Sequence, residues 1–546
     1  MKAIGNIRNI ILAVMIGMSL SSCSDSFLEM HPKDKPSSDN FLVDEGSARQ
    51  LFVASLNPLV TNTQMYAKRF GIICDGLTDD SGLRLNGLTD VQDWDLTPRQ
   101  QYVKDWWNAT YKSINSANYA IQEIPKLAEK GVAQDIIDMY VAAARFIRGF
   151  NYLFLVTFYG EVPLIDRPLS SFEEFSQPRA AISDIYALIL SDFENGKTKL
   201  SKDGAGYQGM PTRAAAAAFL AKTYLYMKDY ANAETEARNA RTVAENDGYR
   251  LIDSYPDIFA EANEGNPELL FYLAYENNSG LWEQCFSVER NVRDIPGKLK
   301  YIQGGDGWGY ALPTRDLYDS YEEGDPRREY TLYYDGCYFG KYTPNDPFEY
   351  NDYRYENGVE VYETVVYKTG DDVLYDYKWS PTGINVKKLT EDLTGLTNVR
   401  YSGLDWPLMR MADLYLILAE SLAEQGDEEA LVWVNKVRAR PSVAMPARTS
   451  ADGSLVDLVR HERRVELAME GQRLYDLFRW DAIKTVFGNG KKVKLHFNSD
   501  YLPDDSSDKF KTVPGLAKYP DNHILFPIPQ EEIDRNSEIF GNNPGY

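Results

Sequence analysis

The chain has 546 residues, four cysteines and a formal net charge of −23. Such a charge repels phosphate backbones and anionic membrane surfaces, which argues against nucleic-acid binding. Aromatic residues make up 13% of the chain, and 38 of them are tyrosines. Because these rings combine an apolar face with a polar tip, their excess favours surfaces that grip amphipathic ligands such as sugars. The alternative is a set of tyrosine-rich strands in a partly exposed sheet.

The amino terminus has the order of a secretory signal. A short basic region precedes an uncharged, mostly apolar run over residues 10–20, which is too short to span a bilayer that needs about 20 such residues. The following LSSC, residues 20–23, resembles a bacterial lipobox, in which Cys23 is lipid-modified and becomes the first mature residue. Several acyl chains on one residue anchor a protein stably. We predict a signal peptide over 1–22 and a lipid-anchored tether over 23–45, the alternative being an ordinary signal with an incidental cysteine.

From residue 46 onward, long helical patterns alternate with irregular loops. Residues 135–160 are apolar nearly all round, which by itself would suit a membrane span. Arg145 and Arg148 lie in the middle of this segment, and each would cost about 2.5–3.5 kcal/mol to insert. Since the two arginines are three residues apart, they share one helix face. We therefore predict a buried central helix.

Two later stretches share a helix–turn–helix pattern. Residues 211–240 turn near Lys228, and residues 407–441 turn at residues 425–427. Small and large apolar residues alternate along each first helix, as in tetratricopeptide-type repeats, where helix pairs bury their faces by stacking on their neighbours. The predicted fold class is all-α (mainly α), a tetratricopeptide-like scaffold of helical pairs with long loop insertions. Tyr/Val alternation over residues 329–380 predicts a few short strands in one insertion.

Two insertions carry the candidate ligand residues, because binding residues concentrate on loops held by a rigid scaffold. Residues 75–98 combine acceptors, a forked donor, an amide and an aromatic face, the mixture that sugars need. Residues 304–310, GGDGWGY, do not match G-x-G-x-x-G, and their glycines allow a tight turn that presents an aromatic pair. The alternative is turn-forming or packing roles. The candidate residues are Asp75, Asp79, Arg84, Asn86, Trp94, Trp282, Trp308 and Tyr310.

Residues 461–480 invite an enzymatic interpretation. Glutamates recur there every four residues, at Glu462, Glu466 and Glu470. Carboxylates held roughly 5–10 Å apart across a sugar could hydrolyse a glycosidic bond. However, acidic and basic residues alternate at three-residue spacing over 470–479, which favours ion pairs along a helix face. We predict a structural network without catalytic residues, and Gly471 indicates the close approach of a neighbouring backbone.

The sequence predicts no cofactor. Its four histidines are scattered and its cysteines lack C-x-x-C spacing, so no transition-metal site is visible. Residues 75–90 are rich in oxygen ligands without the EF-hand spacing, which leaves a structural Ca²⁺ ion as a weak alternative. Apart from Cys23, three cysteines remain, and they allow at most one disulfide.

Several stretches, in order, resemble the SusD/RagB family. The match covers essentially the whole mature chain and indicates one domain over 46–546, with an N-terminal part over 46–240 and a C-terminal part over 241–546. The stretches that carry it, besides the lipobox, are 144–165, 212–233, 304–328, 409–440, 461–480 and 526–546.

The resemblance implies a non-enzymatic lipoprotein, surface-exposed on the outer membrane of Bacteroidota-type bacteria. Such a protein captures a glycan and delivers it to a SusC-type TonB-dependent transporter, with its helical face toward the transporter and its loops holding the ligand. Three alternatives remain open at this point: capture of peptides, as RagB-type relatives do, a surface glycoside hydrolase, and a scaffold that only docks proteins.

Overall fold

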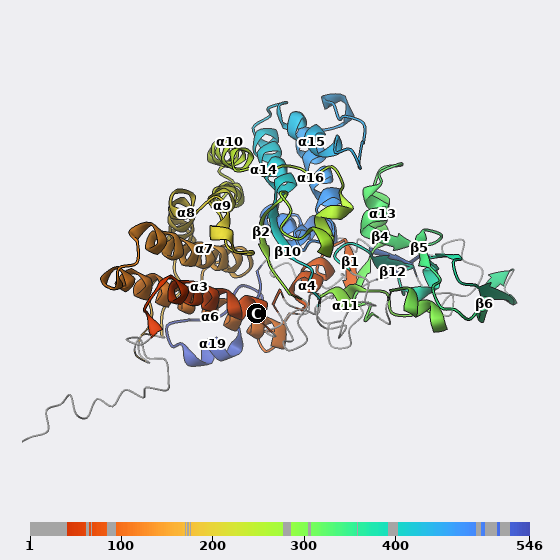
Figure 1. Cartoon of the computed structure of the whole chain (residues 1–546), viewed down its shortest axis with the longest axis horizontal. Coiled ribbons are helices and arrows are strands. Elements are labelled where there is room, and N and C mark those ends of the chain that lie inside the picture. Colours follow the sequence, from red (N-terminus) through yellow and green to blue (C-terminus); the bar gives the residue numbers. More distant parts are fainter. Residues whose placement is uncertain are drawn as a thin grey trace, which may run out of the picture.

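A computed structural model describes most of the chain from residue 41 onward (Figure 1). Cys23 lies outside the described residues. The described part is residues 41–546 apart from 62–64, 67, 84–93, 95, 170, 172–173, 175, 277–285, 304–306, 357–358, 391–401, 488–492, 497–509 and 514–524.

The helices form a stack in which each one packs against the next along the chain (Figure 1). This arrangement lets each amphipathic helix bury its apolar stripe against its neighbours. The mainly helical fold predicted from the sequence is confirmed. The stacked helices are α3 (Glu45–Val60), α6 (Gln101–Glu123), α7 (Gln134–Tyr159), α8 (Ile182–Lys199), α9 (Arg213–Tyr226), α10 (Tyr230–Asn246), α14 (Met411–Glu424), α15 (Ala430–Arg438) and α16 (Leu455–Glu466).

Helix α7 lies at the centre of the amino-terminal half, between α6 and α8. By length and composition alone it could cross a membrane, but 83% of its most apolar 18-residue stretch is buried inside the protein. Arg145 and Arg148 both reach Asp192 of α8, each at 2.8 Å from a carboxylate oxygen. One buried carboxylate thus pairs with both guanidiniums, and the predicted central helix with two arginines on one face is confirmed.

The two predicted helix pairs are present and stack on each other, because α10 packs against α14. Lys228, with φ +60°, turns the chain between α9 and α10, and Gly426, with φ +77°, follows α14. The second pair begins later than predicted, since residues 406–410 form strand β10 (Trp406–Arg410) against β2 (Leu269–Leu273). Backbone pairing with a distant segment overrides the helical pattern there.

Short antiparallel pairs of strands fill the insertions, as predicted for residues 329–380. The strands within residues 332–374 line a small second core in which Tyr333, Tyr342 and Tyr375 are buried beside Trp379, so part of the tyrosine excess is core packing. The pairs are β1 (Ser81–Leu83) with β3 (Ala311–Pro313), β4 (Leu332–Tyr334) with β9 (Ile384–Val386), β5 (Tyr338–Lys341) with β8 (Asp372–Leu374), β6 (Phe348–Glu356) with β7 (Val359–Tyr367), and β11 (Val493–His496) with β12 (Phe510–Val513).

Shorter helices connect the stack to these insertions. Residues 461–480 do not form one helix: α16 ends at Glu466, and Gly471, with φ +72°, precedes the next helix. A Cβ at Gly471 would lie 3.5 Å from the Cα of Gly71, so the predicted close approach of a backbone is confirmed. The short helices are α4 (Phe70–Gly76), α11 (Phe286–Arg290), α12 (Arg315–Ser320), α13 (Arg327–Thr331), α17 (Arg473–Arg479), α18 (Ile483–Phe487) and α19 (Gln530–Arg535).

A buried network of ion pairs joins these segments. Glu466, with no exposed surface, lies 2.7 Å from Arg410, 3.1 Å from Arg440 and 2.9 Å from Arg327. Burial raises the pKa of Glu466, but the three guanidiniums outweigh it and hold that pKa well below its ordinary value. The glutamates of residues 461–480 are therefore structural, as predicted, although their partners come from other elements rather than from the same helix face.

Candidate functional site

Pairing of β1 with β3 brings the two candidate loops together. Leu83 is opposite Ala311, so the loop after α4 and residues 307–310 lie on neighbouring chain segments. In Figure 1, α4, α11 and β1 lie close together between the helical stack and the β-rich end of the molecule. The sequence placed candidate residues on both loops but did not show that the loops meet.

Asp75 connects α4 to α11 in the interior. Its side chain is 1% exposed, lies 2.8 Å from Arg290 and accepts a hydrogen bond from the backbone N–H of Gly471 at 3.0 Å. Arg290 in turn donates to the carbonyl of Met469 at 2.7 Å. Burial raises the pKa of Asp75 to about 7, against the opposing effect of Arg290. This predicted ligand residue faces the protein, not solvent, and it positions the two helices that carry the site.

Asp79 is likewise held by the protein. Arg473 donates to both of its carboxylate oxygens, at 2.9 and 3.0 Å, and Arg464 lies 3.1 Å away. The neighbouring Asp80 pairs with Arg464 at 2.8 Å. These guanidiniums pair with the first acidic residues of the stretch 75–90. Among the residues that the structure describes, no group of three metal-ligating side chains occurs. Asp79 therefore anchors the loop.

Trp94 is also directed inward. It is 2% exposed and stacks on Phe478 with 6.1 Å between the ring centroids, so its face is not open to a sugar. The burial overturns its prediction as a stacking platform. Arg84, Asn86 and Trp282 lie outside the described residues, and their roles stay predictions.

Trp308 and Tyr310 remain partly exposed, with ring centroids 5.5 Å apart. The backbone N–H groups of both residues donate to carbonyls of α11, at 2.8 and 2.7 Å. Gly309 adopts φ +58°, and a Cβ at Gly307 would lie 2.2 Å from the carbonyl oxygen of Asn291. The predicted tight turn that presents the aromatic pair is confirmed for these two glycines, while Gly304 and Gly305 lie outside the described residues.

Arg69 and Tyr102 complete this surface, and the sequence analysis missed both. Arg69 donates to the hydroxyl of Tyr102 at 2.8 Å, and its guanidinium lies 5.9 Å from the Tyr102 ring centroid and 5.8 Å from that of Tyr310. We call Arg69, Tyr102, Trp308 and Tyr310 the Trp308 surface. They precede or begin α4, α6 and β3, so no local pattern in the sequence connects them. Half-exposed rings beside a forked donor can bind the faces and hydroxyls of sugars.

Glu289 of α11 supports the Trp308 surface from beneath. Its side chain is buried, and one oxygen accepts a hydrogen bond from Arg69 at 3.3 Å. The other oxygen has no hydrogen-bond partner among the described residues. Burial raises the pKa of Glu289 to about 7, and Arg69 opposes that shift. The ion pair orders the Arg69 guanidinium between the two tyrosine rings.

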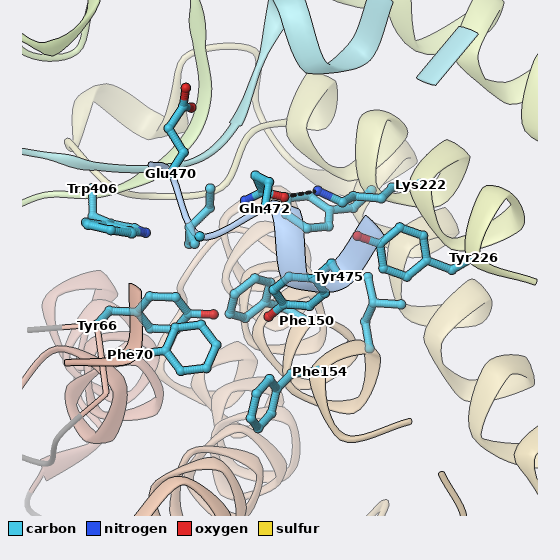
Figure 2. A pocket seen from close by; sticks show the side chains of 14 residues that line it. Tyr66, Phe70, Phe150, Phe154, Lys222, Tyr226, Trp406, Glu470, Gln472 and Tyr475 are labelled. Atoms are coloured by element: carbon cyan, nitrogen blue, oxygen red, sulfur yellow. Dashed lines mark hydrogen bonds between the residues drawn. The ribbon is translucent and has the colours of Figure 1, made fainter. Parts of the chain in front are cut away.

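Hollows also lie elsewhere in the described part of the chain. Figure 2 shows an enclosed cavity between Phe70, Trp406 and Tyr475, where Lys222 donates a hydrogen bond of 2.9 Å to Gln472. Its volume of about 30 Å³ holds water molecules but not a sugar ring, since ligand pockets measure roughly 300–1,000 Å³. A groove of about 1270 Å³ between α6, residues 163–178 and the α19 region is large enough for a ligand.

Comparisons with known proteins agree with this architecture. A model of the "SusD family" matches residues 267–546, and a model described as "Starch-binding associating with outer membrane" matches residues 26–225. A SusD-like protein P2 of Formosa agariphila is 28% identical over 81% of each chain, and a SusD-like protein of Bacteroides ovatus is 24% identical over 94% of each.

Solved structures show the same fold. A SusD-like carbohydrate-binding protein from Bacteroides fragilis superimposes with a TM-score of 0.73 at 23% identity, covering 91% of this chain and 99% of its own. A laminarin-binding SusD-like protein gives a TM-score of 0.68 at 22% identity, covering 92% of this chain and all of its own.

Proposed function

The chain belongs to the SusD family, and we propose that it is a non-catalytic, cell-surface lipoprotein that binds glycans and delivers them to a SusC-type TonB-dependent transporter of the outer membrane. The carbohydrate-binding and laminarin-binding relatives support a glycan as the ligand. The lipobox-like LSSC, residues 20–23, and the outer-membrane description of the matching family model support a lipid anchor at Cys23.

The Trp308 surface is the observation that carries the proposal. Trp308 and Tyr310 offer ring faces to the C–H face of a sugar, and Arg69 offers a fork of N–H donors held in place by Glu289. Each ring and each pair of hydrogen bonds adds modestly, so we expect dissociation constants from micromolar to millimolar, or roughly −4 to −8 kcal/mol. Weak binding suits a protein that must pass its ligand on.

The chemistry of the buried carboxylates supports a non-catalytic role. Glu466, the middle glutamate of the series Glu462, Glu466 and Glu470, is fully buried and pairs with three arginines. It is therefore ionised and has no access to substrate. A glycosidase needs a protonated carboxylic acid beside the glycosidic oxygen. Glu466 lacks both the proton and the access that this role requires.

A binding screen tests the proposal. The soluble protein without its first 23 residues is titrated with a panel of polysaccharides, and the best ligand is titrated again against Trp308→Ala and Tyr102→Ala. Truncating a central contact residue costs more than about 1 kcal/mol, so each variant should bind at least about fivefold more weakly. Tyr119→Ala is the matched control, because Tyr119 is exposed on the same helix as Tyr102 and outside the Trp308 surface.

The screen separates the alternatives. Unchanged binding by both variants, with loss on Asn115→Ala, would move the site to the groove beside α6. Binding of oligopeptides without any response to glycans would establish peptide capture instead. Release of reducing ends from a polysaccharide, lost on Glu466→Gln, would show a hydrolase and overturn the proposal.

Two further experiments test the anchor and the partner. Metabolic labelling with palmitate should mark the wild-type chain and leave Cys23→Ala unlabelled and unbound to membranes. Affinity purification of the lipidated protein from its own outer membrane should recover a TonB-dependent barrel. An unlabelled wild-type chain, or recovery without any such barrel, would contradict these parts of the proposal.

A further inference from the structure

The charge around the Trp308 surface differs from that of the whole chain. The chain carries a net charge of −23, yet Arg69 and Arg293 lie near Tyr310, and Lys68, which precedes Arg69, acts on Glu289 beneath it. Arg69 is paired with Glu289. Lys68 and Arg293 form no ion pair with any carboxylate in the described part of the chain, and Arg293 is exposed. Two cations are thus free to meet a ligand.

Arg293 is placed beside the aromatic pair by the backbone. It follows α11, and a Cβ on Gly309 would lie 3.1 Å from the Cβ of Arg293. Gly309 separates Trp308 from Tyr310 in the chain, so Arg293 lies against the turn that presents both rings. Burial and then Glu289 raise the pKa of Tyr310, and the guanidiniums of Arg69 and Arg293 both oppose that rise, which shows that both act on its phenol.

The carboxylates nearby do not cancel this charge. Glu289 is buried and already paired with Arg69, so its charge is taken up by that guanidinium. Asp294, which follows Arg293, is exposed and adds a second carboxylate. Among the residues that the structure describes here, three cations are accompanied by two carboxylates, which leaves a local positive charge on a strongly acidic protein.

We propose that the saccharide bound by the Trp308 surface is anionic, with Arg293 and Lys68 contacting its carboxylate or sulfate groups while Trp308 and Tyr310 stack on its rings. This inference rests on the proposed glycan-binding function. A guanidinium presents two parallel N–H donors that match the oxygens of a carboxylate or a sulfate, and a lysine ammonium adds a mobile point charge. The negative charge elsewhere on the protein repels polyanions, so the positive region directs them to this surface.

The test compares three oligosaccharides: oligogalacturonate, which carries carboxylates, a sulfated galactan oligomer, and the neutral galactan of the same length. Affinities are measured at about 20 and about 300 mM salt, between which surface electrostatics are largely screened. We expect at least tenfold tighter binding of one anionic class than of the neutral oligomer at low salt, and a smaller ratio at high salt. The two anionic arms distinguish carboxylate from sulfate recognition.

Two variants and one control complete the experiment. Arg293→Gln and Lys68→Gln should each weaken binding of the anionic oligomer at least threefold and leave any binding of the neutral oligomer unchanged. Lys130→Gln, which removes an exposed cation at the end of another helical segment, should change neither. Thermal unfolding of all variants at the wild-type temperature would show that their folds are intact.

The possible failures are distinct. Binding of the neutral oligomer as tight as that of both anionic ones, sensitive to Trp308→Ala, would overturn the preference for anions and leave the glycan-binding function standing. An affinity for the anionic oligomers that does not change in Arg293→Gln would also overturn the inference. No binding of any glycan in the full panel would refute the proposed function itself.

Discussion

Replacing Glu466 by glutamine tests whether the buried ion network is structural. The substitution keeps the shape of the side chain and removes one negative charge. In the structure that charge lies 2.7–3.1 Å from Arg410, Arg440 and Arg327, all of them buried. Glutamine would leave Arg410 and Arg440 above all with too little compensation, because their remaining carboxylate partners, Glu268 and Glu470, already serve other cations.

The expected loss of stability follows from the burial of the pairs. Removing one member of a buried, hydrogen-bonded ion pair costs about 3–5 kcal/mol, since the remaining charge stays in a medium of low dielectric constant. For a chain of 546 residues, an unfolding entropy of about 2.1 cal/mol/K per residue sums to about 1.1 kcal/mol/K. Glu466→Gln should therefore lower Tm by about 3–5 °C.

The assay is calorimetry or circular dichroism at neutral pH, with Glu429→Gln as the matched control. Glu429 pairs with Arg238 at 2.7 Å, but both side chains are more than a third exposed. Exposed pairs contribute under about 1 kcal/mol, so the control should shift Tm by less than about 1 °C. Equal stability of Glu466→Gln and the wild type would refute our account of the network.

Two further predictions concern the turn at the site and the effect of pH. Gly307→Ala should lower stability by about 1–3 kcal/mol and weaken glycan binding, because its Cβ would overlap the carbonyl of Asn291. Gly46→Ala, at an ordinary helical position, is the control. Unchanged stability and binding in Gly307→Ala would show that the turn relaxes around the new methyl group. Burial raises the pKa of Asp405 from 3.8 to about 7, so the folded state holds its proton more tightly than the unfolded state, and this contribution to stability is present below pH 4 and lost as the pH rises through 7. The free energy of unfolding of the wild type should therefore fall between pH 4.5 and 7.5, and Asp405→Asn should reduce that fall by at most about 4 kcal/mol. Urea unfolding of both proteins at the two pH values measures the difference. An equal fall in the wild type and in Asp405→Asn would contradict the prediction.

The sequence by itself determined the features that depend on local periodicity. The buried α7, the pairs α9–α10 and α14–α15 and a tight turn within residues 304–310 were all predicted, because helical spacing, alternating small and large residues and glycines each act over a few neighbouring positions. The family was also visible in the sequence, since its motifs occur in order along the chain. The alternating charges within residues 461–480 predicted ion pairs for the glutamate series, and the pairs are present, but their partners come from distant elements and not from one helix face.

Only the tertiary structure decided which polar and aromatic residues face a ligand. Asp75 and Arg290 are 215 residues apart in the sequence, and Arg69 and Glu289 are 220 residues apart. No local sequence pattern therefore shows that the first pair is buried or that the second pair shapes a surface. A carboxylate on a loop and a carboxylate clamped in the interior have the same sequence context. The difference lies in the electrostatic partners that the fold supplies, and those come from segments brought together when β1 pairs with β3.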